Sequence, residues 1–194
     1  MSSGVAAGPD GRLRCPWGLS TEDYVAYHDT EWGRPIRDDD GIFERLTLEA
    51  FQSGLSWLTI LRKRDNFRAA FAGFDIDAVA RFTATDRGRL LADAGIVRNG
   101  AKIDAALANA RVAADLEGGL AALVWSYQPA SQPAPATAAE VPVQSPQSVA
   151  LAKELKRRGF RFVGPTTAYA LMQAAGLVND HLADCWAREG SRRR

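Results

Sequence analysis

The sequence predicts an all-α fold, and three observations support this prediction. Several stretches repeat apolar residues at helical spacing, and residues that cap helices precede most of these stretches. No stretch alternates apolar and polar residues for longer than about four residues, so a sheet is not expected. A chain of 194 residues can bury a core as one domain, which can be divided into two lobes.

The first part of the chain is expected to begin with a disordered extension and to continue with helices. Residues 1–12 are small, polar and glycine-rich, which predicts disorder. A short helix is expected after Thr21, and a longer helix begins at Asp38–Asp40, whose carboxylates suit a helix N-terminus. Gly54 interrupts this run, and a second amphipathic stretch follows around Ile60.

Two helices joined by a tight hairpin are expected over about residues 86–116. Thr85 can cap the first of them, and Gly95 suits its C-terminus in the left-handed conformation. The second helix covers residues 101–116, which are rich in alanine. The pattern therefore predicts helix, tight hairpin, helix.

The last part of the chain combines an irregular connection with two further helices. Residues 128–146 are rich in proline and small residues, so we expect no regular element there. Ser145–Pro146 provides an N-cap and a first helical residue for a helix that stops at Gly159. Gly164–Pro165 begins another helix, which runs to Gly176.

The net charge of +1 neither indicates nor excludes a nucleic-acid partner. Basic clusters at residues 62–64, at 156–158 and in a tail over 188–194 could contact phosphates, although each is also ordinary for a solvated helix face or a frayed end. No export signal and no apolar run of membrane-spanning length is found. We therefore expect a cytoplasmic monomer with no membrane partner.

All the cysteines and histidines of the chain form one candidate metal site. They are Cys15, His28, His181 and Cys185, and two sulfur and two nitrogen donors match the tetrahedral coordination of structural zinc. If the segment around residues 179–185 is helical, the i, i+4 spacing of His181 and Cys185 places both donors on one face. The alternatives are a disulfide between the two cysteines or two buried free thiols.

Glu49 is the carboxylate that stands out, because it lies among apolar and small residues where a surface glutamate is out of pattern. A buried carboxylate needs a partner or a ligand, and the ordinary partner is an arginine across the core. Aromatic residues occur in nearby segments and could form either core or a surface on which a base stacks: Trp17, Tyr24, Tyr27, Trp32 and Trp57.

Several common catalytic arrangements are not found in the sequence. There is no glycine-rich phosphate loop and no Ser-His-Asp set, and both histidines are expected at the metal site, which leaves neither free for acid–base work. A site built from Glu49, tyrosines and waters could bind a flat, cationic or hydrogen-bonding ring. It would be poorly equipped for a difficult bond cleavage.

Six segments of the sequence, in order and with matching spacing, carry a resemblance to a known family. They are Cys15–Trp17, Tyr27–Gly33, Leu48–Trp57, Asp93–Arg98, Lys156–Gly164 and Met172–His181. Together they make residues 13–187 resemble the DNA-3-methyladenine glycosylase I family. The resemblance implies a single glycosylase domain of the all-α helix-hairpin-helix superfamily.

The resemblance also implies roles for individual residues. Cys15, His28, His181 and Cys185 would hold a structural zinc ion. Glu49 and Tyr27 would hydrogen-bond the excised base, Trp57 would stack on it, and Trp17 and Tyr24 would line its pocket. The hairpin over residues 95–102 would grip the DNA backbone without reading its sequence.

The implied reaction is hydrolysis of the N-glycosidic bond of 3-methyladenine in alkylated double-stranded DNA, which releases the free base and leaves an abasic site. Lys102 is the lysine nearest the hairpin and is interpreted as a phosphate contact or a surface residue, so the enzyme is expected to be monofunctional. Two other classes remain open: a catalytically silent module that binds DNA or a modified base, and a zinc-stabilised protein-interaction domain.

Overall fold

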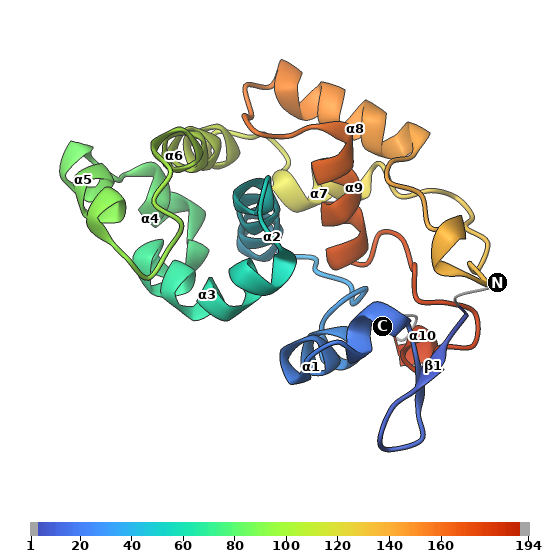
Figure 1. Ribbon diagram of the computed structural model, residues 1–194. Helices are drawn as coiled ribbons and strands as arrows, with labels where there is room; N and C mark the ends of the chain where they lie inside the picture. Colours follow the sequence, from blue (N-terminus) through green and yellow to red (C-terminus); the bar gives the residue numbers. More distant parts are fainter. Residues whose placement is uncertain (1–3, 191–194) are drawn as a thin grey trace.

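The computed structural model describes residues 4–190, and it is predominantly helical (Figure 1). Residues 1–3 and 191–194 lie outside the described part. Most of the predicted basic tail over 188–194 is therefore not described. The helices are α1 Glu22–Thr30, α2 Asp39–Gln52, α3 Trp57–Ala70, α4 Ile76–Ala80, α5 Ala84–Ala92, α6 Gly100–Ala114, α7 Leu120–Trp125, α8 Pro146–Arg157, α9 Pro165–Ala174 and α10 Ala187–Gly190. Short 3-10 helices are η1 Pro16–Leu19, η2 Ala72–Phe74 and η3 Ala138–Glu140, and two short strands are β1 Ala6–Ala7 and β2 Leu13–Arg14.

Three predicted helix starts are confirmed by their capping hydrogen bonds. The Thr21, Asp38 and Ser145 side chains accept from the backbone N–H groups of Tyr24, Gly41 and Ser148. The predicted cap at Thr85 is wrong, because the N-cap of α5 is Thr83, two residues earlier. Thr83 caps it together with Asp86, whose carboxylate accepts from the Thr83 backbone N–H at 2.9 Å.

Gly95 does not take the left-handed conformation predicted for it, because α5 already ends at Ala92 and the following residue is extended. The glycine is required for space instead. A Cβ atom at Gly95 would lie 2.9 Å from Asp93 Oδ1 and 3.1 Å from Asn66 Cβ. The Lys63 ammonium donates to the Gly95 carbonyl at 3.1 Å, which ties the hairpin to α3.

Residues 4–12 form part of a small antiparallel hairpin, where the sequence predicted disorder. Strand β1 pairs with β2, with Ala6 opposite Arg14. The Arg14 side chain is buried and donates to Asp10 at 2.6 Å, which closes the turn between the strands. The segment is thus held by long-range and charged contacts that local composition does not show. Helix α7 was also not predicted.

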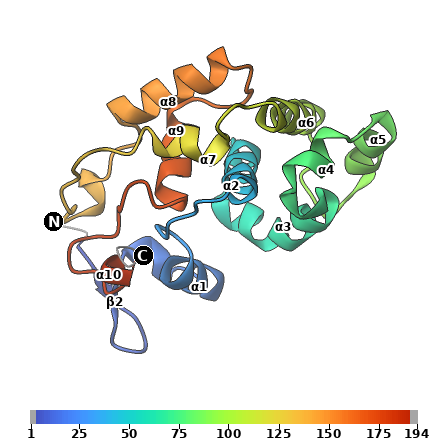
Figure 2. The same cartoon turned by 180° about the vertical axis from the view of Figure 1, so that it is seen from behind.

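Helix α2 runs through the centre of the molecule. Figures 1 and 2 show α3, α4, α5 and α6 on one side of it and α1, α8, α9 and α10 on the other. Helix α4 packs on α6, α8 packs on α9, and α2 contacts both groups. The core under α2, α3 and η2 is aromatic and fully buried: Phe43, Phe51, Phe67, Phe71 and Phe74.

The two ends of the described chain lie side by side, as both views show. The Trp186 backbone N–H donates to the Leu13 carbonyl at 2.9 Å, which joins α10 to the β-hairpin. A small second core cluster lies here and contains Cys15, Leu182, Cys185 and Ala187. Within residues 4–190, no helix is long and apolar enough to cross a membrane.

Candidate functional site

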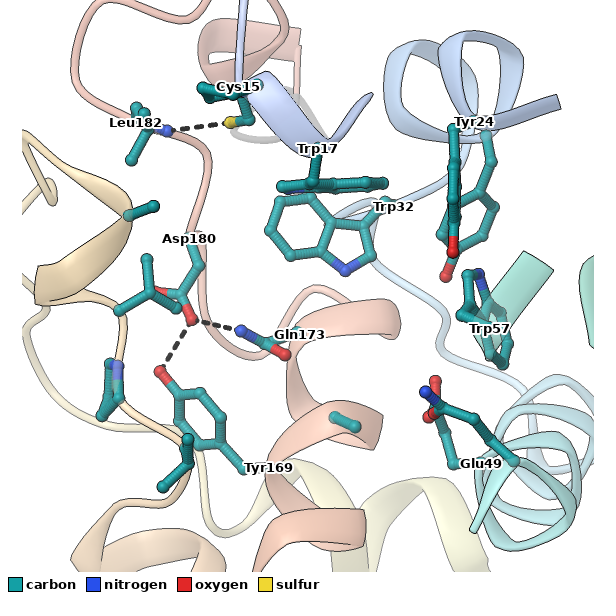
Figure 3. A pocket seen from close by; sticks show the side chains of 18 of the residues that line it. Cys15, Trp17, Tyr24, Trp32, Glu49, Trp57, Tyr169, Gln173, Asp180 and Leu182 are labelled. Carbon is teal, nitrogen blue, oxygen red and sulfur yellow. Dashed lines mark hydrogen bonds between the residues drawn. The ribbon is translucent and has the colours of Figure 1, made fainter. Parts of the chain in front are cut away.

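A cavity of about 780 Å³ lies where η1, α1, the α2–α3 connection, α9 and residues 138–143 meet (Figure 3). Its lining is rich in aromatic rings and contains two carboxylates, Glu49 and Asp180. Among the described residues that line it, none is a lysine, arginine or histidine. The aromatic side chains of the lining are Trp17, Tyr24, Tyr27, Trp32, Trp57 and Tyr169.

Glu49 lies on α2 and is 7% exposed, with its carboxylate at the cavity wall. No donor among residues 4–190 hydrogen-bonds this carboxylate. Burial raises the pKa of Glu49 to about 8, against the opposing effect of the Arg45 charge. The carboxyl group is therefore desolvated, unpaired and directed to a space that a ligand can fill.

The ordinary alternative, an arginine that pairs with Glu49, does not describe this structure. Arg45 lies one turn earlier on α2, but its guanidinium donates to Glu31 at 3.0 Å. Arg64 also donates to Glu31, at 2.6 and 2.8 Å. Burial raises the pKa of Glu31, but these hydrogen bonds outweigh it and lower the pKa overall. Arg45 thus pairs with Glu31, and no described residue forms a salt bridge with Glu49.

Tyr27 is 3% exposed and lies on α1 beside the cavity. Burial and the nearby Glu49 charge raise the pKa of Tyr27, so its hydroxyl remains a hydrogen-bond donor. Its ring centroid lies 5.5 Å from that of Trp57, the first residue of α3. Trp17 contacts Tyr24 edge-on, with centroids 5.7 Å apart. All five residues predicted for a base pocket therefore line one cavity.

The four predicted metal donors also meet, and all are buried. His28 Nε2 lies 3.2 Å from His181 Nδ1 and 3.5 Å from Cys185 Sγ. Cys185 Sγ lies 3.6 Å from His181 Nδ1, and Cys15 Sγ lies 4.0 Å from it. These separations are close to the edges of a tetrahedron around an ion bound at about 2.0–2.3 Å. Both cysteines are free, so the disulfide alternative is not what the structure shows.

The surrounding groups orient the donors as they do in metal sites. Asp29 accepts from His28 Nδ1 at 2.8 Å, which leaves Nε2 directed to the cluster. Arg14 holds the same carboxylate at 2.8 Å. His181 Nε2 donates to the Trp32 carbonyl at 3.1 Å, and the Leu182 backbone N–H donates to Cys15 Sγ at 3.3 Å. The cluster therefore has the donor set and the oriented ligands of a candidate metal site.

The helical arrangement considered for residues 179–185 is wrong. The chain turns there instead, and the Cys185 N–H donates to the Leu182 carbonyl at 2.9 Å. This turn brings Cys185 Sγ beside His181 as effectively as a helix would. The proximity of His181 and Cys185 was therefore predicted correctly, but the helical spacing given as its reason does not occur.

Lys102 is not the surface residue or phosphate contact that the sequence suggested. It is 8% exposed, and its ammonium donates to the carbonyls of Phe51 and Ser53 at 2.9 and 2.6 Å. Burial lowers the pKa of Lys102. The side chain satisfies the carbonyls at the end of α2, just before the turn that leads to Trp57.

Several residues of the cavity wall were not singled out from the sequence, among them Tyr169, Gln173 and Asp180. Tyr169 and Gln173 lie on α9, and both hydrogen-bond the buried carboxylate of Asp180, at 2.7 and 2.8 Å. The available signal was the position of Asp180 directly before a predicted metal ligand.

Comparison with known proteins agrees with this geometry. The family model for methyladenine glycosylase matches residues 17–189. The chain belongs to the methyladenine glycosylase family. DNA-3-methyladenine glycosylase 1 of Escherichia coli is 45% identical over 185 residues, which is 92% of this chain and 98% of the relative.

Solved structures of 3-methyladenine DNA glycosylase I resemble this methyladenine glycosylase over most of its length. A crystal structure of 3-methyladenine DNA glycosylase I is 44% identical, with a TM-score of 0.85 over 89% of this chain and 98% of that one. The Staphylococcus aureus enzyme, solved to explain its recognition of 3-methyladenine, is 34% identical, with a TM-score of 0.85 over 90% of this chain and 96% of that one.

Proposed function

We propose that this methyladenine glycosylase hydrolyses the N-glycosidic bond of 3-methyladenine in alkylated double-stranded DNA. The observation that carries the proposal is the aromatic cavity with the unpaired, buried carboxylate of Glu49 and no basic residue in its lining. Such a cavity favours a flat cationic ring and disfavours a phosphate group. The recognition of 3-methyladenine by the Staphylococcus aureus relative supports the same ligand.

The chemistry of the substrate suits a cavity with few catalytic groups. Methylation at N3 makes the adenine of the nucleotide cationic, which weakens its bond to C1′. When this bond breaks, both electrons pass to the base, which leaves as a neutral ring without needing a proton. Water adds to C1′ and loses a proton to solvent, leaving an abasic site. The enzyme therefore needs to extrude, select and hold the base more than it needs to activate it.

Glu49 and Tyr27 are assigned to hydrogen-bond the base, and Trp57 to stack on it. Trp17 and Tyr24 complete the aromatic wall. A cationic ring beside Glu49 lowers the pKa that burial has raised, so binding drives the carboxyl group into its ionised form. Neutral adenine gains neither this Coulomb attraction nor the cation–π attraction of the rings.

Zinc is the ion that we assign to the Cys₂His₂ cluster, since two sulfurs and two nitrogens within 4.8 Å of one another match its preference. Cys15, His28, His181 and Cys185 would use all four positions of a tetrahedral ion, which leaves none for a substrate. The ion would stabilise the fold when bound. The residues around it also form one wall of the cavity, because Cys15 and Leu182 line both sites.

The α5–α6 hairpin is assigned to the DNA backbone. Arg98 and Asn99, directly before α6, are exposed, and helix N-termini bind phosphates without reading sequence. Lys102 is engaged with α2 carbonyls and is unsuited to form a Schiff base. The enzyme is therefore assigned as monofunctional, with the abasic strand left uncut.

The test is chromatography of the bases that the protein releases from DNA treated with dimethyl sulfate, with Glu49→Ala for comparison. We expect release of 3-methyladenine but not of the more abundant 7-methylguanine, and loss of that release in the variant. Absence of release by a folded, metal-loaded wild type would overturn the enzymatic proposal and leave a module that binds DNA or a modified base.

A further inference from the structure

The side-chain amide of Gln173 is held in one orientation at the wall of the cavity. Its nitrogen donates to Asp180 Oδ2 at 2.8 Å, and its oxygen has no partner among the described residues. Figure 3 shows the nitrogen turned to Asp180 and the oxygen turned away from it, on the side of the cavity where Glu49 lies. Gln173 thus presents a hydrogen-bond acceptor to the cavity.

This orientation is imposed by a chain of hydrogen bonds that begins at a backbone group. The Asn179 N–H can only donate, and it donates to Gln132 Oε1 at 2.7 Å. The Gln132 nitrogen must then face Asp180 and donates to Oδ1 at 2.5 Å. The Tyr169 hydroxyl donates to Oδ2 at 2.7 Å.

Asp180 therefore serves only as an acceptor. It is 3% exposed, and its two oxygens accept hydrogen bonds from three donors. Burial and the hydrogen bond to Asp180 raise the pKa of Tyr169, which keeps that donor protonated. A Gln173 amide turned the other way would place its oxygen against the carboxylate, so the reversed orientation is excluded.

We propose that Gln173 is a specificity-determining residue, held by Asp180 so that its carbonyl oxygen accepts a hydrogen bond from an N–H group of the extruded base. The inference rests on the proposed function and extends it. An amino-bearing methylated purine offers such a donor, whereas a purine with a carbonyl group at that position offers a second acceptor. The cavity therefore selects by hydrogen-bond polarity as well as by charge.

The experiment measures binding of 3-methyladenine and of 3-methylhypoxanthine by quenching of tryptophan fluorescence. Gln173→Met keeps the length of the side chain and removes the acceptor. Asp180→Asn offers Gln173 a donor, which lets the amide turn and present its nitrogen to the cavity. The double variant Asp180→Asn with Gln173→Glu exchanges the two groups and restores an oxygen at the cavity wall. Gln128→Met is the control, because Gln128 is exposed and lies outside the cavity lining.

Wild type should prefer 3-methyladenine, and Gln173→Met and Asp180→Asn should each reduce that preference at least roughly fivefold. The double variant should regain most of it, and Gln128→Met should keep it. Metal content and melting temperature are measured in parallel. If Asp180→Asn loses its metal, Gln173→Met decides, since it changes no neighbour of a metal donor.

Two failures are distinguishable. A wild type that binds and excises 3-methyladenine, with the preference unchanged in Gln173→Met, would overturn the role of Gln173 and leave the proposed function intact. A wild type that neither binds nor releases 3-methyladenine would overturn both.

Discussion

Tyr27 and His28 are neighbours in the chain, yet their side chains belong to two different sites. Tyr27 lines the cavity, and His28 belongs to the Cys₂His₂ cluster. Both are almost fully buried, and the Trp17 ring contacts both of them. A substitution at the metal cluster is therefore expected to alter the cavity as well, through Trp17 and helix α1.

Cys185→Ala should abolish stoichiometric metal binding and lower the melting temperature by roughly 10 °C or more, because a four-donor structural site contributes folding free energy directly. Metal content by atomic emission and melting by circular dichroism measure both effects. Asp184→Ala changes the exposed residue beside it and should do neither. A Cys185→Ala protein that keeps its metal and melts like wild type would show that the four-donor assignment is wrong.

Asp29→Ala should weaken metal affinity roughly tenfold to a hundredfold, because Asp29 orients the His28 ring through a 2.8 Å hydrogen bond. Competition with a chromogenic chelator measures the affinity. Asp23→Ala removes a carboxylate from the same helix, where its partner Arg62 is solvent-exposed, and should leave the affinity unchanged. Equal affinities in the two variants would argue against the orienting role.

Glu49→Gln should remove a pH dependence from the free energy of unfolding. Burial raises the pKa of Glu49 from 4.5 to about 8, so between these values the folded protein holds a proton that the unfolded chain has released. This contribution to stability is fully present at pH 4.5 and is lost as the pH rises through 8.

The amide of Glu49→Gln cannot ionise. At pH 9 the free energy of unfolding of this variant should therefore exceed that of wild type by on the order of 1–4 kcal/mol. Its base excision should nevertheless fall sharply. Urea unfolding at pH 5, 7 and 9 measures the difference, with the exposed Glu117→Gln as control. Parallel pH profiles for wild type and Glu49→Gln would contradict the desolvated state of this carboxyl group.

Lys102→Met should destabilise the fold by roughly 1–3 kcal/mol, because it leaves the carbonyls of Phe51 and Ser53 without their donor. Excision should also fall, since these carbonyls precede the turn that places Trp57. Lys153→Met, an exposed position on α8, should change neither quantity. In the wild type, borohydride should trap no covalent complex with DNA, and a trapped complex would contradict monofunctional action.

Gly88→Ala and Gly95→Ala should change stability in opposite directions. A Cβ at Gly88, inside α5, meets nothing within 4 Å, and alanine should stabilise the helix by about 0.5–1 kcal/mol. At Gly95 the Cβ would lie 2.9 Å from Asp93 Oδ1, which would disturb the 2.7 Å bond from the Gly95 N–H and cost about 1–2 kcal/mol. Urea unfolding of both variants tests the pair. A stabilised Gly95→Ala would show that the hairpin relaxes freely.

Local patterns were sufficient where neighbouring residues decide the structure. Thr21, Asp38 and Ser145 cap helices as their positions predicted. At α5 the sequence offered two threonines, and Asp86 distinguishes them, because an acidic residue three positions after Thr83 completes a capping box. Position 88, three residues after Thr85, is glycine and cannot do so.

Long-range contacts decided the features that local patterns missed. Lys102 is buried because carbonyls from another helix need a donor, and those carbonyls lie about fifty residues earlier in the chain. The β-hairpin is stabilised because the Arg14 guanidinium donates to both Asp10 and Asp29. The orientation of Gln173 likewise follows from a network that joins three segments. The sequence predicted which residue types line the cavity. It did not predict which of their atoms donate or accept hydrogen bonds there.

The junction of the two chain ends has a consequence for biosynthesis. Cys15 and His181 are 166 residues apart, and a ribosome adds about 5–20 residues per second. The thiol of Cys15 therefore remains outside the finished cluster for on the order of ten seconds while the rest of the chain is made. A nascent chain interrupted within α9 would have only two of the four metal donors, so we expect the base cavity to be completed only with the last residues translated.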